Sequence, residues 1–204
     1  WGKGFTDWVT VKNAKPLYEG HKQPRVPLNE NYYDLSKDEN VEWQAKLAHD
    51  NGIYGFGVYH YWFNNDKNLL TRPAEILRDS KNGFVKYFFV WDNCLWKRSW
   101  SNVDGNDWAP LADNPSDKKK GVKILIPYIL GREPDWENHY NYCRTHFLSS
   151  NYEKKDNKPV FCINGYSKEI GEMCAYWNSL AKKDGFDGIF FVHESTYKKC
   201  LREE

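Results

Sequence analysis

Apolar positions along the chain recur first at a helical and then at a strand period, and this change predicts helices and strands in alternation. Val41 and Ala45 lie one turn apart behind segment 36–39, which has the Ser-x-x-Glu pattern of a capping box, and Gly52 is expected to end this helix. The run 52–63 is apolar and aromatic. We therefore expect a strand that is buried on both faces and opens into polar residues at its far end.

The same order of elements continues to the end of the chain. We expect helices over 72–82, 135–148 and 167–183, and strands over 85–91, 122–130, 160–164 and 188–192. Pro127 lies inside one of these strands and limits it to an edge or a bulge. Residues 1–34 and 101–120 carry Gly, Pro and polar side chains and are expected to be loops. Alternation of helix and strand is typical of parallel βαβ units and predicts an α/β fold.

Length and charge limit the classes of protein to which the chain can belong. With 204 residues and 40% hydrophobic content we expect a single domain over 1–204, truncated at both ends because it opens on Trp1 without a Met. The net charge is +1, from 29 basic and 28 acidic residues mixed along the chain, which argues against nucleic acid as a partner. No apolar run approaches the ~20 residues that cross a bilayer, so no transmembrane segment is expected.

The cysteines and the catalytic motifs give no sign of a cofactor. Five cysteines without a C-x-x-C pair argue against a disulfide framework and a zinc ribbon. They indicate reduced thiols and a cytoplasmic location, either free or at the membrane surface. Neither H-E-x-x-H nor G-x-S-x-G is present, and no G-x-G-x-x-G follows a strand. We therefore expect no metal and no bound cofactor.

Aromatic, amide and imidazole side chains gather where the expected strands end. In parallel α/β folds, ligands bind at the carboxyl ends of the strands. The candidate substrate-binding residues at these ends are His60, Tyr61, Trp62, Trp91, Asn93, Trp96 and His193. Trp and Tyr stack on the apolar faces of sugars while amides and imidazoles bind hydroxyls, so the set predicts a carbohydrate ligand. The alternative is that the Trp rings only cover the sheet and that both histidines are hydrogen-bonded structural residues.

Two carboxyl groups at the strand ends are candidates for catalysis. Asp92 and Glu194 follow two different strands, and hydrolysis of a glycosidic bond requires two carboxyls that flank it. Asp92 is the stronger candidate, because aromatic residues surround it in the sequence. For Glu194, a solvated residue without a catalytic role is an equal alternative.

The sequence also resembles a known family. Trp1 to Trp8, the segment 15–27 and the run 52–64 are similar to the WbsX family, which is described as polysaccharide-biosynthesis glycosyltransferases and as glycoside hydrolase family 99-like. Segments 91–100 and 158–161 fit the same pattern. The resemblance implies an incomplete (β/α)8 TIM-barrel-like domain, since the family has further strands before and after the matched positions. It also implies glycosyl transfer onto a glycan or lipid-linked oligosaccharide in O-antigen or capsule biosynthesis.

Two departures from the family pattern leave the activity open. Where the family reads Trp-x-Asn-Glu-Asn-Trp, this chain has Cys94 in place of the glutamate, and where it often reads Ile-Glu-Gln, this chain has Pro127. Either Asp92 compensates for the missing acids, or this member binds glycans with weak or no catalysis. Three hypotheses therefore remain: a glycosyltransferase, a glycoside hydrolase of the endo-mannosidase type, and a non-enzymatic glycan-binding module.

Overall fold

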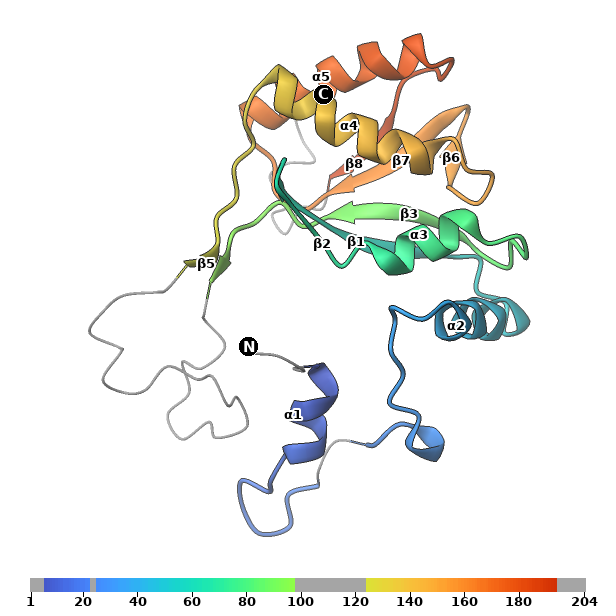
Figure 1. Ribbon diagram of the computed structural model, residues 1–204, viewed down its shortest axis with the longest axis vertical. Coiled ribbons are helices and arrows are strands. Elements are labelled where there is room, and N and C mark those ends of the chain that lie inside the picture. The colour runs from blue at the N-terminus through green and yellow to red at the C-terminus, as the bar shows by residue number, and fades with distance from the viewer. Residues whose placement is uncertain (1–5, 23–24, 98–123, 194–204) are drawn as a thin grey trace, which may run out of the picture. The chain divides into compact units, whose positions relative to one another are not determined.

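The computed structural model describes residues 6–22, 25–97 and 124–193 (Figure 1). The contacts within the chain divide it into two units. The smaller unit spans 1–34 and 96–126, and the larger unit spans 35–95 and 127–204. The loop expected over 101–120 lies outside the described residues.

The described residues of the smaller unit form short elements. These are α1 (Asp7–Asn13), the 3-10 turn η1 (Leu28–Glu30), and the antiparallel strands β4 (Trp96–Lys97) and β5 (Ile124–Ile126). The sequence pattern predicts loop over 1–34 and is wrong at α1. This helix is anchored by Trp8, which donates its indole N–H to the Tyr33 carbonyl (2.9 Å) and packs edge to face on the Tyr33 ring. β5 ends before Pro127, because a proline cannot donate to the ladder.

The larger unit is built on a mostly parallel sheet. Its strands are β1 (Gly55–Asn64), β2 (Lys67–Leu69), β3 (Lys86–Trp91), β6 (Lys154–Lys155), β7 (Lys158–Ile163) and β8 (Phe190–His193). The sheet order is β2-β1-β3-β7-β6, with β8 also paired to β7. The β1–β3, β3–β7 and β7–β8 pairs are parallel, whereas the short β2 and β6, which the pattern did not predict, pair antiparallel. The α/β class expected from the alternation is confirmed.

The expected helices of the larger unit are present. They are α2 (Asp38–Asp50), α3 (Arg72–Asp79), α4 (Glu133–Phe147) and α5 (Lys168–Lys183). The capping box expected over 36–39 is wrong, because α2 begins after Lys37 without a side-chain cap. Ser167 does cap α5, by accepting a hydrogen bond from the Ile170 N–H (3.3 Å). None of the described helices is both long and apolar enough to span a bilayer.

Helices α4 and α5 lie side by side on one face of the sheet (Figure 1). Phe89 of β3 contacts His146 of α4, and Phe161 of β7 contacts Trp177 of α5. The opposite face is more open, since Tyr59 of β1 is 55% exposed. The expectation that the strand 52–63 is buried on both faces is therefore wrong, because successive side chains of a strand point to opposite faces and these helices cover one of them.

The parallel strands follow one another across the sheet in the order in which they occur along the chain. An order that advances in one direction keeps the right-handed βαβ connections on a single face. Dinucleotide-binding folds instead reverse the strand order at a switch point, where the ligand binds. No such reversal occurs among the described parallel strands.

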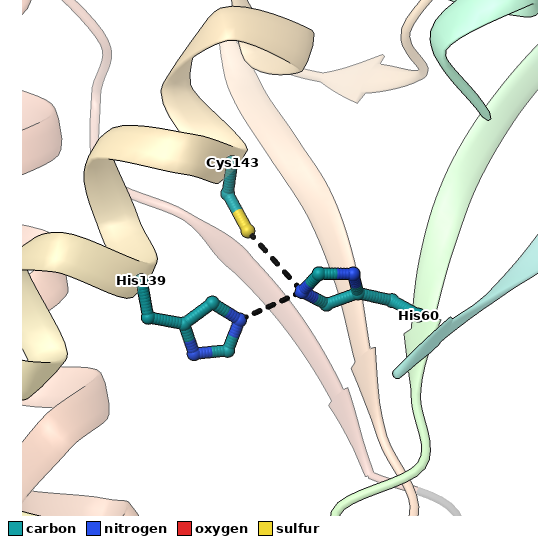
Figure 2. A group of neighbouring side chains, drawn as sticks. All are labelled: His60, His139 and Cys143. Atoms are coloured by element: carbon teal, nitrogen blue, oxygen red, sulfur yellow. Dashed lines mark hydrogen bonds between the residues drawn. The ribbon is translucent and has the colours of Figure 1, made fainter. Parts of the chain in front are cut away.

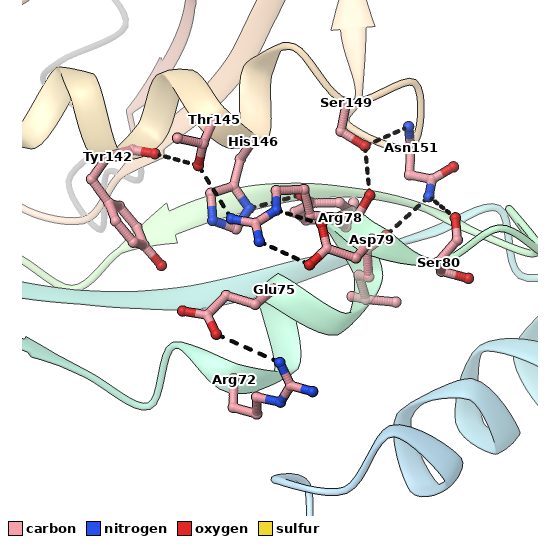
Figure 3. A network of polar contacts seen from close by, with 12 residues as sticks. Arg72, Glu75, Arg78, Asp79, Ser80, Tyr142, Thr145, His146, Ser149 and Asn151 are labelled. Atoms are coloured by element: carbon pink, nitrogen blue, oxygen red, sulfur yellow. Dashed lines mark hydrogen bonds and ion pairs between the residues drawn. The ribbon is translucent and has the colours of Figure 1, made fainter.

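Asn151 ties the end of α3 to the segment that follows α4 (Figure 3). Its buried amide donates to the carbonyls of Leu77 (2.9 Å) and Ser80 (2.8 Å). Replacing Asn151 with Ala should lower the free energy of unfolding by about 1–3 kcal/mol, because both carbonyls lose their donor. Urea denaturation would measure the loss. Replacement of the exposed Asn82 with Ala is the control, and an equal loss in both variants would contradict the role of Asn151.

His146 is a fully buried titratable group beside the same network (Figure 3). Its Nδ1 atom lies 2.8 Å from the Tyr87 hydroxyl. Burial, together with the nearby Arg78 guanidinium, lowers the pKa of His146 to about 3, against a smaller opposing effect of Asp79. The imidazole therefore stays neutral in the folded chain at pH values where an unfolded histidine is charged.

This difference predicts a loss of stability in acid. Above pH ~6.5 neither state binds the proton, so His146 has no effect on stability there. As the pH falls, the unfolded chain takes up the proton first, and the free energy of unfolding should fall by about 1.4 kcal/mol per pH unit until the folded pKa is reached. In urea titrations at a series of pH values, the slope of the variant His146→Phe should be smaller by this amount, while the buried His60 and His139, whose pKa values are also lowered, keep their own contributions. The exposed His49→Phe variant should keep the full slope, and equal slopes in both variants would contradict the assignment.

Candidate functional site

The carboxyl ends of the parallel strands form one edge of the sheet, and the register aligns them. Across β1, β3, β7 and β8, one row of paired residues consists of His60, Trp91, Ile163 and His193. Paired residues point to the same face of a sheet, and their neighbours in the chain point to the other. Predicted site residues on β1 and β3 that belong to this row therefore face one side of the sheet, and their immediate neighbours in the chain face the other side.

The residues of the row on β1 and β3 pack against helix α4. His60 is 3% exposed and Trp91 is 1% exposed, and the Trp91 indole N–H donates to the Trp62 carbonyl (3.1 Å). The Trp62 ring stacks on His139 of α4 at a centroid distance of 4.6 Å. These three predicted substrate-binding residues lie in the core between sheet and helices, as the alternative of a structural role requires.

The opposite face carries Tyr61, Asp92 and Asn164 at the same edge. The Asp92 N–H donates to the His60 carbonyl (3.1 Å) and the Asn164 N–H donates to the Trp91 carbonyl (3.2 Å), so the ladder continues by one residue on both strands. By alternation, both side chains point away from the helices. The Oδ1 atom of Asn164 is buried and has no hydrogen-bond partner among the described residues. A ligand hydroxyl would satisfy this acceptor.

A pocket of about 410 Å³ opens beside this edge, where β3 and β7 run into the loops before α4 and α5. Its lining residues are Asn93, Tyr128, Leu130, Gly165, Tyr166, Ser167, Glu169 and Ile170. The volume is in the range of small-molecule sites. Two tyrosine rings, a carboxylate and a hydroxyl give the pocket the combination of apolar faces and hydrogen-bonding groups that a sugar requires.

Asn93 joins the two strands that border the pocket. Its amide donates to the Gly165 carbonyl (2.6 Å), and the Gly165 N–H donates to Asn93 Oδ1 (2.7 Å). A Cβ atom at Gly165 would meet the Asn93 side chain at 3.3 Å, so the loop can approach this closely because residue 165 is glycine. Asn93 thus holds the wall of the pocket in place, and much of its hydrogen-bonding capacity is used within the protein.

Tyr166 and His193 form the accessible ring surface of the edge. Tyr166 is 61% exposed, and its ring lies edge to face with His193 at a centroid distance of 5.3 Å. His193 is the last residue of β8, and Tyr166 lies three positions after Ile163, where β7 ends. An exposed aromatic pair at this position is suited to stacking on a sugar ring.

Sequence reasoning missed Tyr128 and Glu169, which also line the pocket. Glu169 lies in the first turn of α5, and hydrogen bonds from its own backbone N–H and from Ser167 hold the pKa of its carboxyl below the usual range. It is therefore an ionised acceptor at neutral pH. The sequence signal that could have identified Glu169 is its place in the first turn of the helix that follows a strand, because that turn lies at the carboxyl edge of the sheet.

Asp92 and Cys94 lie beside one another after β3. Burial, and then the neighbouring Asp92 carboxylate, raise the pKa of the Cys94 thiol. The thiol is therefore protonated at neutral pH and acts as a donor to Asp92 rather than as a nucleophile. Cys94 stands at the position where the family resemblance predicts a glutamate. In this chain that position therefore supplies a hydrogen-bond donor to Asp92.

Two predicted site residues lie outside the described part of the larger unit. Trp96 begins β4 and belongs to the smaller unit. Glu194 lies outside the described residues.

Within the described ranges, one group of His, Cys, Asp or Glu side chains is close enough together to hold a metal ion. Figure 2 shows His60 of β1 facing His139 and Cys143 of α4. The group is buried on the helix-covered face of the sheet, away from the side chain of Asp92. A search for local motifs cannot find it, because His60 and His139 are 79 positions apart in the sequence.

Comparisons with known proteins agree with a glycan-related role. The sequence profile of the family described as "Glycosyltransferase WbsX" matches residues 1–204. Among curated proteins, the chain is 38% identical over 113 residues to "Uncharacterized protein WxcX" from two strains of Xanthomonas campestris pv. campestris. The match covers 55% of this chain and 16% of the relative, so the chain spans less than a fifth of the length of the curated relatives it matches. No solved structure matches.

Proposed function

Because the chain belongs to the WbsX glycosyltransferase family along residues 1–204, we propose that it transfers a glycosyl unit in the biosynthesis of a cell-surface polysaccharide, O-antigen or capsule. The observation that carries the proposal is the carboxyl edge of the sheet, where Asp92 and Asn164 directly precede Asn93 and Gly165, two residues that line a pocket with two tyrosine rings. The rings would stack on the sugar, and the carboxylate and amide would bind its hydroxyls. The substrates would be a sugar donor and a glycan or lipid-linked oligosaccharide acceptor.

We also propose that the larger unit is part of a (β/α)8 barrel. Its parallel strands advance in chain order, with α4 and α5 together on one face, as in a segment of such a barrel. The face that carries Tyr59 and Asp92 would then be the barrel interior. Its carboxyl edge would be the mouth, where barrel enzymes bind their substrates.

In the proposed mechanism, Asp92 is the general base. Its carboxylate would take the proton of the acceptor hydroxyl while that oxygen attacks the anomeric carbon of the donor and the leaving group departs. Glu194, which follows His193 in the sequence, is the proposed second acid. Tyr166 and His193 would provide the stacking surface, and Asn164 Oδ1 would accept a hydrogen bond from a sugar hydroxyl.

A second candidate function is glycan binding with weak or no catalysis. It is favoured by Cys94 and Pro127, which replace the two acids of the family pattern. Hydrolysis of the endo-mannosidase type is the third candidate, with Asp92 and Glu194 as the two carboxyls.

Product analysis with the full-length protein separates these functions. The protein is incubated with a panel of nucleotide-activated sugars and oligosaccharide acceptors, and products are followed by mass spectrometry. Growth of an acceptor only in the presence of a donor would support transfer. New reducing ends without a donor would support hydrolysis, and binding on a glycan array without either product would support the binding module.

Replacing Tyr166 with Ala should weaken binding of a glycan found on such an array. Loss of the stacking ring should cost about 0.5–1.5 kcal/mol, roughly two- to tenfold in Kd, measured by calorimetry. The control is Tyr54→Ala, because Tyr54 is also an exposed tyrosine but lies before the amino end of β1. Equal weakening in both variants would contradict binding at the carboxyl edge.

We propose that the protein acts in the cytoplasm, either free or at the membrane surface where a lipid-linked acceptor would be reached. The cysteines support this location, because Cys94, Cys143, Cys162 and Cys174 all carry free thiols.

A further inference from the structure

Two histidines and a cysteine converge inside the layer between sheet and helices. His60 Nε2 lies 2.8 Å from His139 Nε2, and Cys143 Sγ lies 3.8 Å from the same His60 nitrogen (Figure 2). His139 and Cys143 are four positions apart on α4, so both project from the same side of the helix. The three candidate ligand atoms lie within 4.8 Å of one another, and all three residues are buried.

Aromatic packing holds the two imidazoles in this orientation. Phe89 stacks on His60 at a centroid distance of 4.5 Å, and Tyr142 lies parallel to His60 at 5.5 Å. Trp62 stacks on His139 with an interplanar angle of 6°. Close-packed rings on these faces restrict rotation of the imidazoles, so the two Nε2 atoms stay directed at one point.

Two of the three separations between the ligand atoms can be compared directly with those of a metal centre. Bond lengths of ~2.0–2.1 Å to nitrogen and ~2.3 Å to sulfur place tetrahedral ligands about 3.4 Å apart for two nitrogens and about 3.6 Å apart for nitrogen and sulfur. The Cys143–His60 distance of 3.8 Å already fits. The two imidazoles, now 2.8 Å apart, would separate by about 0.6 Å to admit an ion.

We propose that His60, His139 and Cys143 form a site for a thiophilic closed-shell metal ion, Cu⁺ or Zn²⁺. A thiolate with two imidazoles is a ligand set that such ions prefer over harder cations. The position in the core favours the monovalent ion, because Cu⁺ with one thiolate is neutral whereas Zn²⁺ leaves a net positive charge among apolar rings. The site is separate from the proposed glycan edge, since His60 and Asp92 lie on opposite faces of the sheet.

Binding changes the protons of the cluster in a defined way. Without an ion, His139 Nε2–H can donate to the lone pair of His60 Nε2, and the protonated Cys143 thiol lies 3.8 Å from the same nitrogen. With an ion, the thiol gives up its proton to solvent and His139 takes its tautomer with the proton on Nδ1, while both imidazoles remain neutral. Metal binding therefore releases a proton from Cys143.

Metal analysis of the purified 204-residue chain tests the proposal. The chain is expressed with added copper or zinc, its metal content is measured by mass spectrometry, and a second sample is refolded with Co²⁺. We expect about one ion per chain and a thiolate-to-cobalt charge-transfer band. Cys143→Ser should reduce both to background. Cys174→Ser, which removes a half-buried thiol on α5 outside the cluster, should leave both unchanged.

The results separate the possible outcomes. Retention of Cu⁺ in competition with Zn²⁺ would support both the site and the charge argument, and retention of Zn²⁺ would support the site with a divalent ion. An ion kept by the Cys143→Ser variant would overturn the proposal, because it would lie elsewhere. Absence of both bound metal and the cobalt band in the unaltered chain would overturn it as well, and this test holds even where the variant does not fold.

Discussion

Replacing Asp92 with Asn in the full-length protein should lower the turnover of glycosyl transfer by about 10²- to 10⁴-fold, with the acceptor still bound. The amide keeps the shape of the side chain but cannot take a proton from the acceptor hydroxyl. Asp92 lies on the face of the sheet that points away from the helices, where its neighbour Cys94 is a protonated donor. The measurement is kcat and KM for a donor and acceptor pair identified by product analysis.

The matched control is Asp66→Asn, an exposed aspartate in the turn between β1 and β2, which should leave kcat unchanged. Unchanged turnover in the Asp92 variant would remove Asp92 from the mechanism. If the unaltered protein is inactive and the Cys94→Glu variant is active, the result would support the glycan-binding hypothesis for the unaltered protein. It would also show that the glutamate expected from the family resemblance is the group whose absence prevents catalysis.

Replacing Trp177 with Ala should lower the free energy of unfolding by about 3–5 kcal/mol. Trp177 of α5 is 0% exposed, and its ring contacts His139 of α4 (4.8 Å) and Phe161 of β7 (5.1 Å). Its indole N–H also donates to the Trp136 carbonyl (2.9 Å). The substitution thus leaves a cavity where two helices meet the sheet, and it removes the hydrogen bond to the Trp136 carbonyl.

Urea denaturation followed by circular dichroism would measure this loss. Trp43→Ala on α2 removes the same side chain from a partly exposed position and should cost about 1 kcal/mol or less. Comparable losses in the two variants would show that Trp177 does not join the layers in the way the structure indicates.

The limits of sequence reasoning are clearest in the first strand. The run 52–63 correctly predicted a strand, which pairs parallel with β3, and Tyr61 lies on the face that carries Asp92. His60 and Trp62 are neighbours of Tyr61 in the sequence but pack against α4. A residue's place in the chain predicts which end of a strand it occupies. It does not predict which face is covered, because that depends on where the helices pack.

The pocket was only partly predictable for a related reason. Asn93 was expected from its position after a strand, whereas Tyr128 and Glu169 come from a connecting segment and a helix first turn that the sequence does not connect with β3. They reach the same pocket because the β3 and β7 ends are fixed together by the Asn93–Gly165 hydrogen bonds. The cluster of His60, His139 and Cys143 is a stronger case, since nothing in either local segment relates His60 to Cys143.

By itself, the sequence determined the alternation of helices and strands, the parallel α/β class and the edge at which ring and acid side chains gather. Hydrophobic period, helix ends and turn residues act over a few positions, so they can be read along the chain. Only the tertiary structure decided which strand-end residues face the proposed ligand and which meet His139 and Cys143 in the core. Those choices follow from the register between strands and from the packing of α4 and α5 on one face, which bring together residues that are far apart in the sequence.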